Sequence, residues 1–194
     1  MRLFFALPVP APVKESLTAY LGKLRTPGLG VRWVDPELWH LTLRFLGEVE
    51  EKKLHRVTAA ATAATAGGGD FPWRCRGLGA FPRLDRPAVL WAGVGPGAEE
   101  MARLAAALEA RLEGEGFPRE GRPFHPHLTL GRAAGTSRGR RGRRPAPVAE
   151  RVLDLFRAAE ERDFGPARAE AVELVASRLT PAGPRYHRVE SFPL

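Results

Sequence analysis

Residues 31–49, VRWVDPELWHLTLRFLGEV, and residues 124–132, FHPHLTLGR, each contain the tetrapeptide HLTL. The first copy occupies positions 40–43 and the second occupies positions 127–130, so the copies lie in different halves of the 194-residue chain. Each copy follows a proline-containing turn and reads as the start of a β-strand. We infer a chain with two similar lobes, each of which contributes one copy.

The alternation of side chains along a strand gives each copy a polar face and an apolar face. His40 and Thr42 share one face of the first strand, and the two leucines share the other. His127 and Thr129 share a face of the second strand in the same way. A pseudo-two-fold arrangement that brings the strands together would therefore form a cleft with two imidazoles and two hydroxyls.

Paired imidazoles suit displacement at phosphorus, because one must remove a proton from the nucleophile and the other must protonate the leaving oxygen. Threonine hydroxyls can donate to the non-bridging phosphate oxygens. The alternative is a metal site, which needs further His, Cys or carboxylate ligands, and none accompanies either copy. We therefore expect phosphoester chemistry with no metal and no cofactor.

Other residues near the motifs are candidates with a structural alternative. Arg44 shares the parity of His40 and is a candidate phosphate or ribose contact, the alternative being an exposed strand arginine. Phe45 has the opposite parity and is expected in the core. His125 precedes the second copy without a threonine of its own and is expected outside the reacting pair. Three aromatic residues are candidates either for stacking on a nucleobase or for the core; these are Trp33, Trp39 and Phe124.

Composition narrows the class of protein. The chain is 44% hydrophobic and 27% charged, and no apolar run is long enough for a transmembrane helix. The opening residues lack the pattern of a secretory signal, and a single cysteine, Cys75, excludes an internal disulfide; we expect a cytoplasmic protein with Cys75 in the core.

The net charge is +8, and the segment SRGRRGRR at 137–144 contains five arginines, Arg138 to Arg144. Such a segment favours contact with RNA, and a solvated loop is the alternative.

Hydrophobic periodicity and turn residues predict an α+β chain with helices and strands along both halves. The predicted helices are 10–25, 50–66, 99–115 and 148–159. The predicted strands are 3–7, 31–34, 40–49, 71–81, 89–94, 124–132, 171–179 and 185–192.

The two HLTL contexts and the ending ASRLTPAGPRYHRVESFPL at 176–194 resemble the two-histidine (2H) phosphoesterase superfamily over essentially the whole chain. The most similar branch is the RNA 2′,3′-cyclic phosphodiesterase family, historically called 2′-5′ RNA ligase. The resemblance implies a bilobal, LigT-like α+β fold, in which pseudo-two-fold-related lobes with antiparallel sheets flank a central cleft. Residues 1–194 are then a single bilobal domain.

The same resemblance implies roles for individual residues. His40 would be the proton donor and His127 the proton acceptor, with Thr42 and Thr129 binding phosphate. The family often has an arginine shortly after the second motif, which Arg132 matches. Simple strand parity puts Arg132 opposite His127, so a contact with phosphate requires an irregularity in the strand.

The leading hypothesis is hydrolysis of RNA terminal 2′,3′-cyclic phosphate to a 2′-phosphomonoester by a monomer. The expected partners are RNAs with such ends, tRNA halves among them, and no membrane. Ligation of the cyclic end to a 5′-hydroxyl RNA uses the same site, with an RNA hydroxyl in place of water. The alternative from another class is an RNA- or tRNA-binding module with incidental phosphodiesterase activity.

Overall fold

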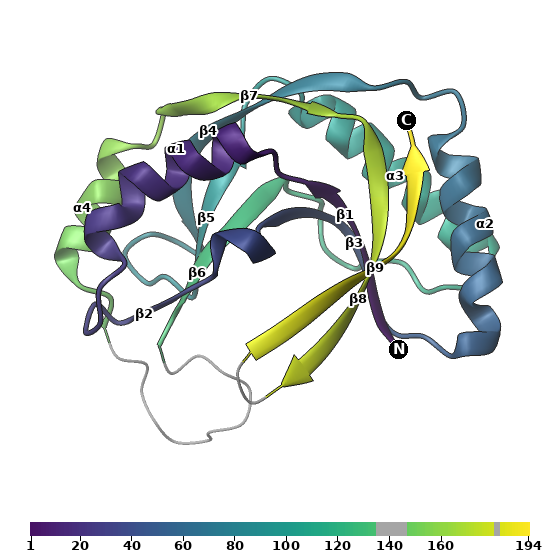
Figure 1. The fold of residues 1–194 in the computed structure, drawn as a ribbon, viewed down its shortest axis with the longest axis horizontal. Helices are drawn as coiled ribbons and strands as arrows, with labels where there is room; N and C mark the ends of the chain where they lie inside the picture. Colours follow the sequence, from purple (N-terminus) through teal and green to yellow (C-terminus); the bar gives the residue numbers. More distant parts are fainter. Residues whose placement is uncertain (135–146, 181–182) are drawn as a thin grey trace.

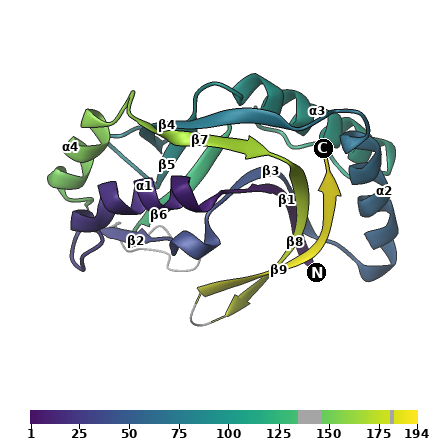
Figure 2. The ribbon, with the colours of Figure 1, turned by 45° about the horizontal axis from the view of Figure 1, so that its top comes forward.

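The computed structural model describes residues 1–134, 147–180 and 183–194, which form an α+β fold on a curled antiparallel sheet (Figures 1 and 2). The strands are β1 (Arg2–Pro8), β2 (Val31–Trp33), β3 (His40–Glu48), β4 (Phe71–Phe81), β5 (Val89–Val94), β6 (His127–Ala133), β7 (Asp163–Ala169), β8 (Ala171–Thr180) and β9 (Gly183–Pro193). The helices are α1 (Ala11–Leu21), α2 (Leu54–Thr65), α3 (Ala98–Gly114) and α4 (Glu150–Ala158).

The order of the strands explains the bilobal shape. It is β7-β4-β5-β6-β3-β1-β8-β9, with β2 paired to β6. The two strands that carry HLTL, β3 and β6, are neighbours at the boundary between the two halves of the sheet. The predicted bilobal α+β architecture with antiparallel pairing is confirmed.

Two of the helices pack against the half of the sheet opposite to the strand that they follow in the chain (Figure 2). Helix α1 follows β1 in the chain but packs against β7 in the other half of the sheet. Helix α3 follows β5 but packs against β3, and it also contacts α2. Helix α4 contacts β4, and α2 contacts β8 and β9. Because α1 and α3 each link a strand of one half to the surface of the other half, the two lobes share one hydrophobic core.

Strand β1 separates this core from the opposite face of the sheet. Leu3, Phe5 and Leu7 are fully buried in the main core. Phe4 and Ala6 point the other way and form a small separate apolar cluster with Val175 of β8. This second cluster lies on the face of β1 that also contacts His40, so it supplies an apolar floor beside the motif.

Most elements agree with the sequence predictions, and β4 and β5 have the predicted ends. Strand β7 was not predicted, because its sequence DFGPARA contains glycine, proline and aspartate, all unfavourable in strands. It lies at the edge of the sheet, where Pro166 is tolerated because a missing backbone donor has no ladder partner to lose.

Cys75 is buried, and burial raises the pKa of its thiol to about 12, which confirms its expected place in the core. Within the described ranges, no helix combines the length and the apolar character needed to cross a membrane.

Candidate active site

The register of β3 and β6 brings the two HLTL motifs side by side. The strands begin at His40 and His127 and pair antiparallel, with Leu41 directly opposite Leu128. In an antiparallel ladder this pair puts the histidine of each motif opposite the threonine of the other. The pseudo-two-fold relation inferred from the repeat therefore passes through the paired leucines.

Both histidines are held by the same kind of hydrogen bond. Nδ1 of His40 lies 2.8 Å from the carbonyl oxygen of Leu38, and Nδ1 of His127 lies 2.8 Å from the carbonyl oxygen of His125. A carbonyl oxygen only accepts, so Nδ1 must be the donor in each ring. In the neutral ring Nε2 is then the unprotonated nitrogen, ready to accept a proton.

The surroundings shift both histidines toward the neutral form. Burial is the main cause that lowers the pKa of His40, and the charge of His127 lowers it further, while the hydrogen bond to Leu38 opposes the change. Burial is also the main cause that lowers the pKa of His127; the hydrogen bond to the His125 carbonyl opposes this change, and the charges of His125 and Arg132 add to it. Desolvation disfavours the charged imidazolium at both positions.

The threonines are available for a ligand. Thr42 and Thr129 are half-buried. Neither hydroxyl forms a hydrogen bond with any other residue of the described ranges. Each can therefore donate to an oxygen atom of a ligand that lies on the histidine face of the two strands.

A β-bulge occurs at the same position in both motifs. The last leucine of each tetrapeptide, Leu43 and Leu130, is the extra residue that the neighbouring strand skips. An extra residue reverses the alternation of the residues that follow it. The fifth residue after each histidine, Phe45 and Arg132, is consequently exposed on the histidine face.

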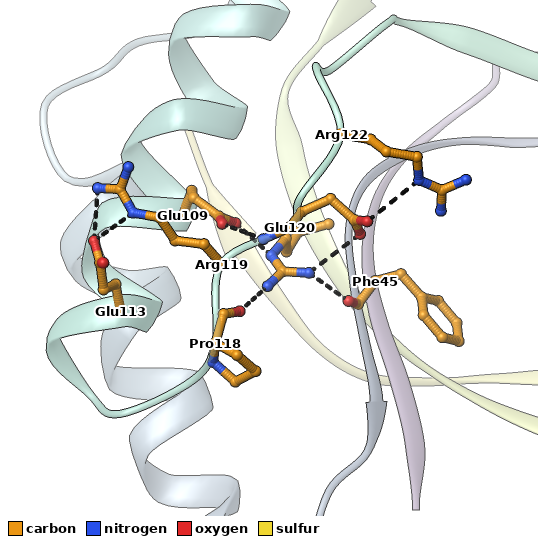
Figure 3. A network of polar contacts seen from close by, with 8 residues as sticks. Phe45, Glu109, Glu113, Pro118, Arg119, Glu120 and Arg122 are labelled. Atoms are coloured by element: carbon orange, nitrogen blue, oxygen red, sulfur yellow. Dashed lines mark hydrogen bonds and ion pairs between the residues drawn. The ribbon is translucent and has the colours of Figure 1, made fainter.

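The parity prediction for Arg44 and Phe45 was therefore wrong. Arg44 is only 8% exposed and forms ion pairs with Glu109 of α3 and with Glu120, and it donates to the carbonyl oxygens of Phe45 and Pro118. Figure 3 shows these groups gathered around one guanidinium. All its described partners are protein groups on the core side, so Arg44 is a structural residue rather than a phosphate contact.

A phosphate contact by Arg132 requires an irregularity in its strand, and the bulge at Leu130 is such an irregularity. The bulge brings the exposed side chain of Arg132 to the face of His127. The Arg132 charge contributes to lowering the pKa of His127 and also acts on Tyr186 of β9. Arg132 thus lies within electrostatic range of groups from both lobes.

Aromatic rings flank both histidines in a matching pattern. The ring of His40 lies 4.8 Å from Phe4 at an interplanar angle of 30° and 5.2 Å from Tyr186 at 85°. The ring of His127 lies 6.2 Å from His125 at 28° and 5.0 Å from Phe81 at 89°. Each imidazole therefore has one tilted and one perpendicular neighbour, which restricts its orientation.

A pocket of about 220 Å³ opens beside His40. Phe4 and Tyr186 form part of its wall, and an ion pair between Glu173 and Arg188 lies at its edge. Its mixture of aromatic and charged groups is compatible with an organic anion.

The remaining aromatic candidates pack in or against the core, and one of them, Trp39, also lines the pocket beside His40. Trp39 is 3% exposed in the core, and Trp33 donates from Nε1 to the Leu24 carbonyl oxygen. Phe124 is half-buried against the same core. The core alternative is therefore the better description of all three.

Phe4 and Tyr186 were missed as neighbours of His40. Phe4 lies in an apolar run in which every residue reads as core, and Tyr186 is far from both motifs in the sequence. Only the position of Tyr186 on a predicted terminal strand offered a signal, because pairing can bring the last strand beside the first.

Two imidazoles with free Nε2 atoms can transfer two protons on opposite sides of one reacting centre. Within the described ranges, no group of three or more His, Cys, Asp or Glu side chains is arranged to hold a metal ion. The expectation of chemistry without a metal stays a prediction.

The comparisons with known proteins agree over the whole chain. A family model described as LigT like Phosphoesterase matches residues 7–91 and 93–186. The RNA 2′,3′-cyclic phosphodiesterase of Archaeoglobus fulgidus is 35% identical over 192 residues, which cover 99% of each chain. The crystal structure of the protein TT0787 of Thermus thermophilus has a TM-score of 0.76 at 34% identity and covers 100% of this chain and 98% of that chain.

A second solved structure, Escherichia coli LigT complexed with 3′-AMP, has a TM-score of 0.74 at 26% identity. The match covers 100% of this chain and 97% of that chain. With the family model matching nearly all of the sequence, this chain belongs to the LigT-like phosphoesterase family.

Proposed function

We propose that the protein hydrolyses a terminal 2′,3′-cyclic phosphate on RNA to a 2′-phosphomonoester. Several relatives that match most of the chain have the name RNA 2′,3′-cyclic phosphodiesterase, which supports this activity. The observation that carries the proposal is the pair of matched histidines. Each has Nδ1 on a backbone carbonyl oxygen, and within the described ranges neither Nε2 has a hydrogen-bond partner. The names of the relatives do not favour the alternative of an RNA-binding module.

In the proposed reaction, Nε2 of His127 accepts a proton from water as the water oxygen attacks phosphorus. The bond between phosphorus and the ribose 3′-oxygen breaks, and His40 protonates that oxygen from Nε2. Burial favours neutral His40, so the negative phosphate must raise its pKa on binding to supply the proton. Thr42, Thr129 and Arg132 would stabilise charge on the non-bridging oxygens.

Product analysis tests this proposal directly. Short RNAs that end in 2′,3′-cyclic phosphate would be incubated with the protein, and the products compared with 2′-phosphate and 3′-phosphate standards. The expected product is the 2′-phosphate. Exclusive formation of the 3′-phosphate would reverse the assignment of the leaving oxygen.

Replacing either threonine by valine should lower kcat by about tenfold to a hundredfold, because each variant loses a hydrogen bond to a charged oxygen. Valine keeps the shape of threonine, so the strand and the histidines should be unaffected. Thr58→Val is a matched control, since Thr58 lies on α2 and its hydroxyl only donates to the His55 carbonyl. Unchanged kcat in both Thr42→Val and Thr129→Val would remove these hydroxyls from the mechanism.

The pH profile of kcat/KM should be bell-shaped and displaced to the acid side. The free protein must have one histidine protonated and one neutral, and burial lowers the pKa of both below the ordinary 6.5. Raising the pH through the pKa of His40 removes the proton that this residue must donate. Because that pKa lies below 6.5, kcat/KM should already be falling at pH 7. The two limbs belong to the coupled pair. A profile still rising at about pH 7.5 would contradict this assignment.

The partner is proposed to be RNA, tRNA halves among the substrates. The segment Arg138 to Arg144 lies outside the described residues, and its contact with RNA stays a prediction from charge. Replacing its five arginines should weaken binding of long RNA and flatten the salt dependence, because fewer counterions are released. Cleavage of a dinucleotide cyclic phosphate should change little. An unaltered salt slope would favour the solvated-loop alternative.

We further propose that residues 1–194 act as one bilobal domain and as a cytoplasmic monomer. The shared hydrophobic core supports the single domain, and the free buried thiol of Cys75 is compatible with a reducing compartment.

A further inference from the structure

We propose that a second, larger pocket binds the single-stranded RNA nucleotides that precede the cyclic phosphate end. The pocket has a volume of about 530 Å³. Most of its lining residues come from the start of β1 and from the β8–β9 hairpin, which extends past that start. Figures 1 and 2 show the course of the hairpin. The wall of the pocket includes Met1, Arg2, Arg178, Leu179, Arg185 and Tyr186. This inference rests on the proposed function and adds a subsite to it.

Exposed apolar side chains gather at this pocket. Among the described residues, the large hydrophobic side chains classed as exposed are Met1 (47%), Phe45 (38%), Leu179 (68%) and Tyr186 (36%). Three of them line the pocket, and the ring of Phe45 lies 4.9 Å from the guanidinium of Arg2. Large apolar groups that cluster on a surface mark a binding site, and flat or apolar ones provide surfaces for splayed bases.

The arginines of the pocket form no ion pair with a described carboxylate. Glu48 also lines the pocket, but its described ion pair is with the N-terminal ammonium of Met1 rather than with an arginine. Arg178 of β8 is directly opposite Arg185 of β9, although like charges in this position repel each other. Within the described ranges neither forms an ion pair with a carboxylate, and Arg2 also forms none. By contrast, Arg188 farther along β9 pairs with Glu173. An arrangement of unpaired facing guanidinium groups is stabilised by an anion such as the RNA backbone.

The pocket adjoins the candidate active site through one shared residue. Tyr186 lines both this pocket and the smaller pocket beside His40, and its ring is 5.2 Å from the His40 ring. A chain whose last phosphate lies at His40 therefore meets the arginines within the next nucleotides. The combination of aromatic surface and cationic groups is the one that proteins use for single-stranded nucleic acid.

The test compares two substrates and two double variants. The substrates are a nucleoside 2′,3′-cyclic phosphate and a hexanucleotide with the same end. In Arg178→Ala/Arg185→Ala, kcat/KM for the hexanucleotide should fall by about 5- to 20-fold and its salt slope should flatten, because phosphate contacts are lost. The nucleoside substrate, which does not reach the pocket, should change by less than about twofold. The matched control is Arg56→Ala/Arg111→Ala, which removes the same charge from exposed positions on α2 and α3.

Equal losses for both substrates, or equal losses in the control variant, would overturn the subsite. Failure of the proposed function is a separate outcome, visible as no turnover of either substrate by the unaltered protein. In that case, fluorescence anisotropy with a 5′-labelled hexanucleotide still tests the pocket. Weaker binding by Arg178→Ala/Arg185→Ala than by the control would support it, and identical binding would overturn it.

Discussion

Replacing His40 or His127 by alanine is expected to lower turnover of a nucleoside 2′,3′-cyclic phosphate by about 10² to 10⁴, the usual contribution of a positioned acid or base. Each variant removes the only imidazole on its side of the cleft whose Nδ1 is held by a backbone carbonyl two residues earlier. Single-turnover and steady-state rates would measure the loss.

The double variant should lose less than the product of the single losses, because two residues that act in one step are not independent. His55→Ala is the matched control, since His55 is exposed on α2, and it should keep full activity. Circular dichroism would verify that all variants are folded. Near-normal rates in a folded single variant would contradict the paired mechanism, and so would loss of activity on chelation that zinc or manganese restores.

The arrangement of the two motifs was predictable because it depends on local patterns. Strand alternation gave His40 and Thr42 a common face, and the exact repeat suggested that a second strand would match the first. The register with Leu41 opposite Leu128 agrees with both inferences. The ends of β4 and β5 were predictable for the same reason, since glycine- and proline-rich turns bound their alternating patterns.

The side-chain positions that were predicted wrongly or missed depend on pairing between strands that are distant in the sequence. Leu43 and Leu130 have no local feature that marks a bulge, and only pairing with β1 and β5 reveals that one residue is extra. That single irregularity buries Arg44 and turns Phe45 and Arg132 to the histidine face. Tyr186 likewise reaches His40 only because β9 pairs with β8, which in turn pairs with β1. Local sequence patterns do not reveal this order of strands.

The buried position of Arg44 leads to the second prediction with a large effect. Arg44→Ala should destabilise the protein by about 2 to 4 kcal/mol, since removing one partner of a buried ion pair leaves the other uncompensated. This loss of stability is smaller than for a fully buried pair, because the side chains of Glu109 and Glu120 are 20% and 38% exposed and water can solvate them. For a chain of this size, Tm should fall by about 4 to 16 °C.

Thermal and denaturant unfolding would measure the loss, with Arg119→Ala as the matched control, because Arg119 is 66% exposed in its ion pair with Glu113 and should contribute little. Kinetics below the melting range separate the two roles considered for Arg44. A phosphate contact would raise KM with stability unchanged, whereas the network in Figure 3 predicts lost stability with KM unchanged. Because Arg44 ties β3 to the Pro118–Glu120 segment that leads toward β6, its loss should loosen the connection between the two motif strands before it affects substrate binding.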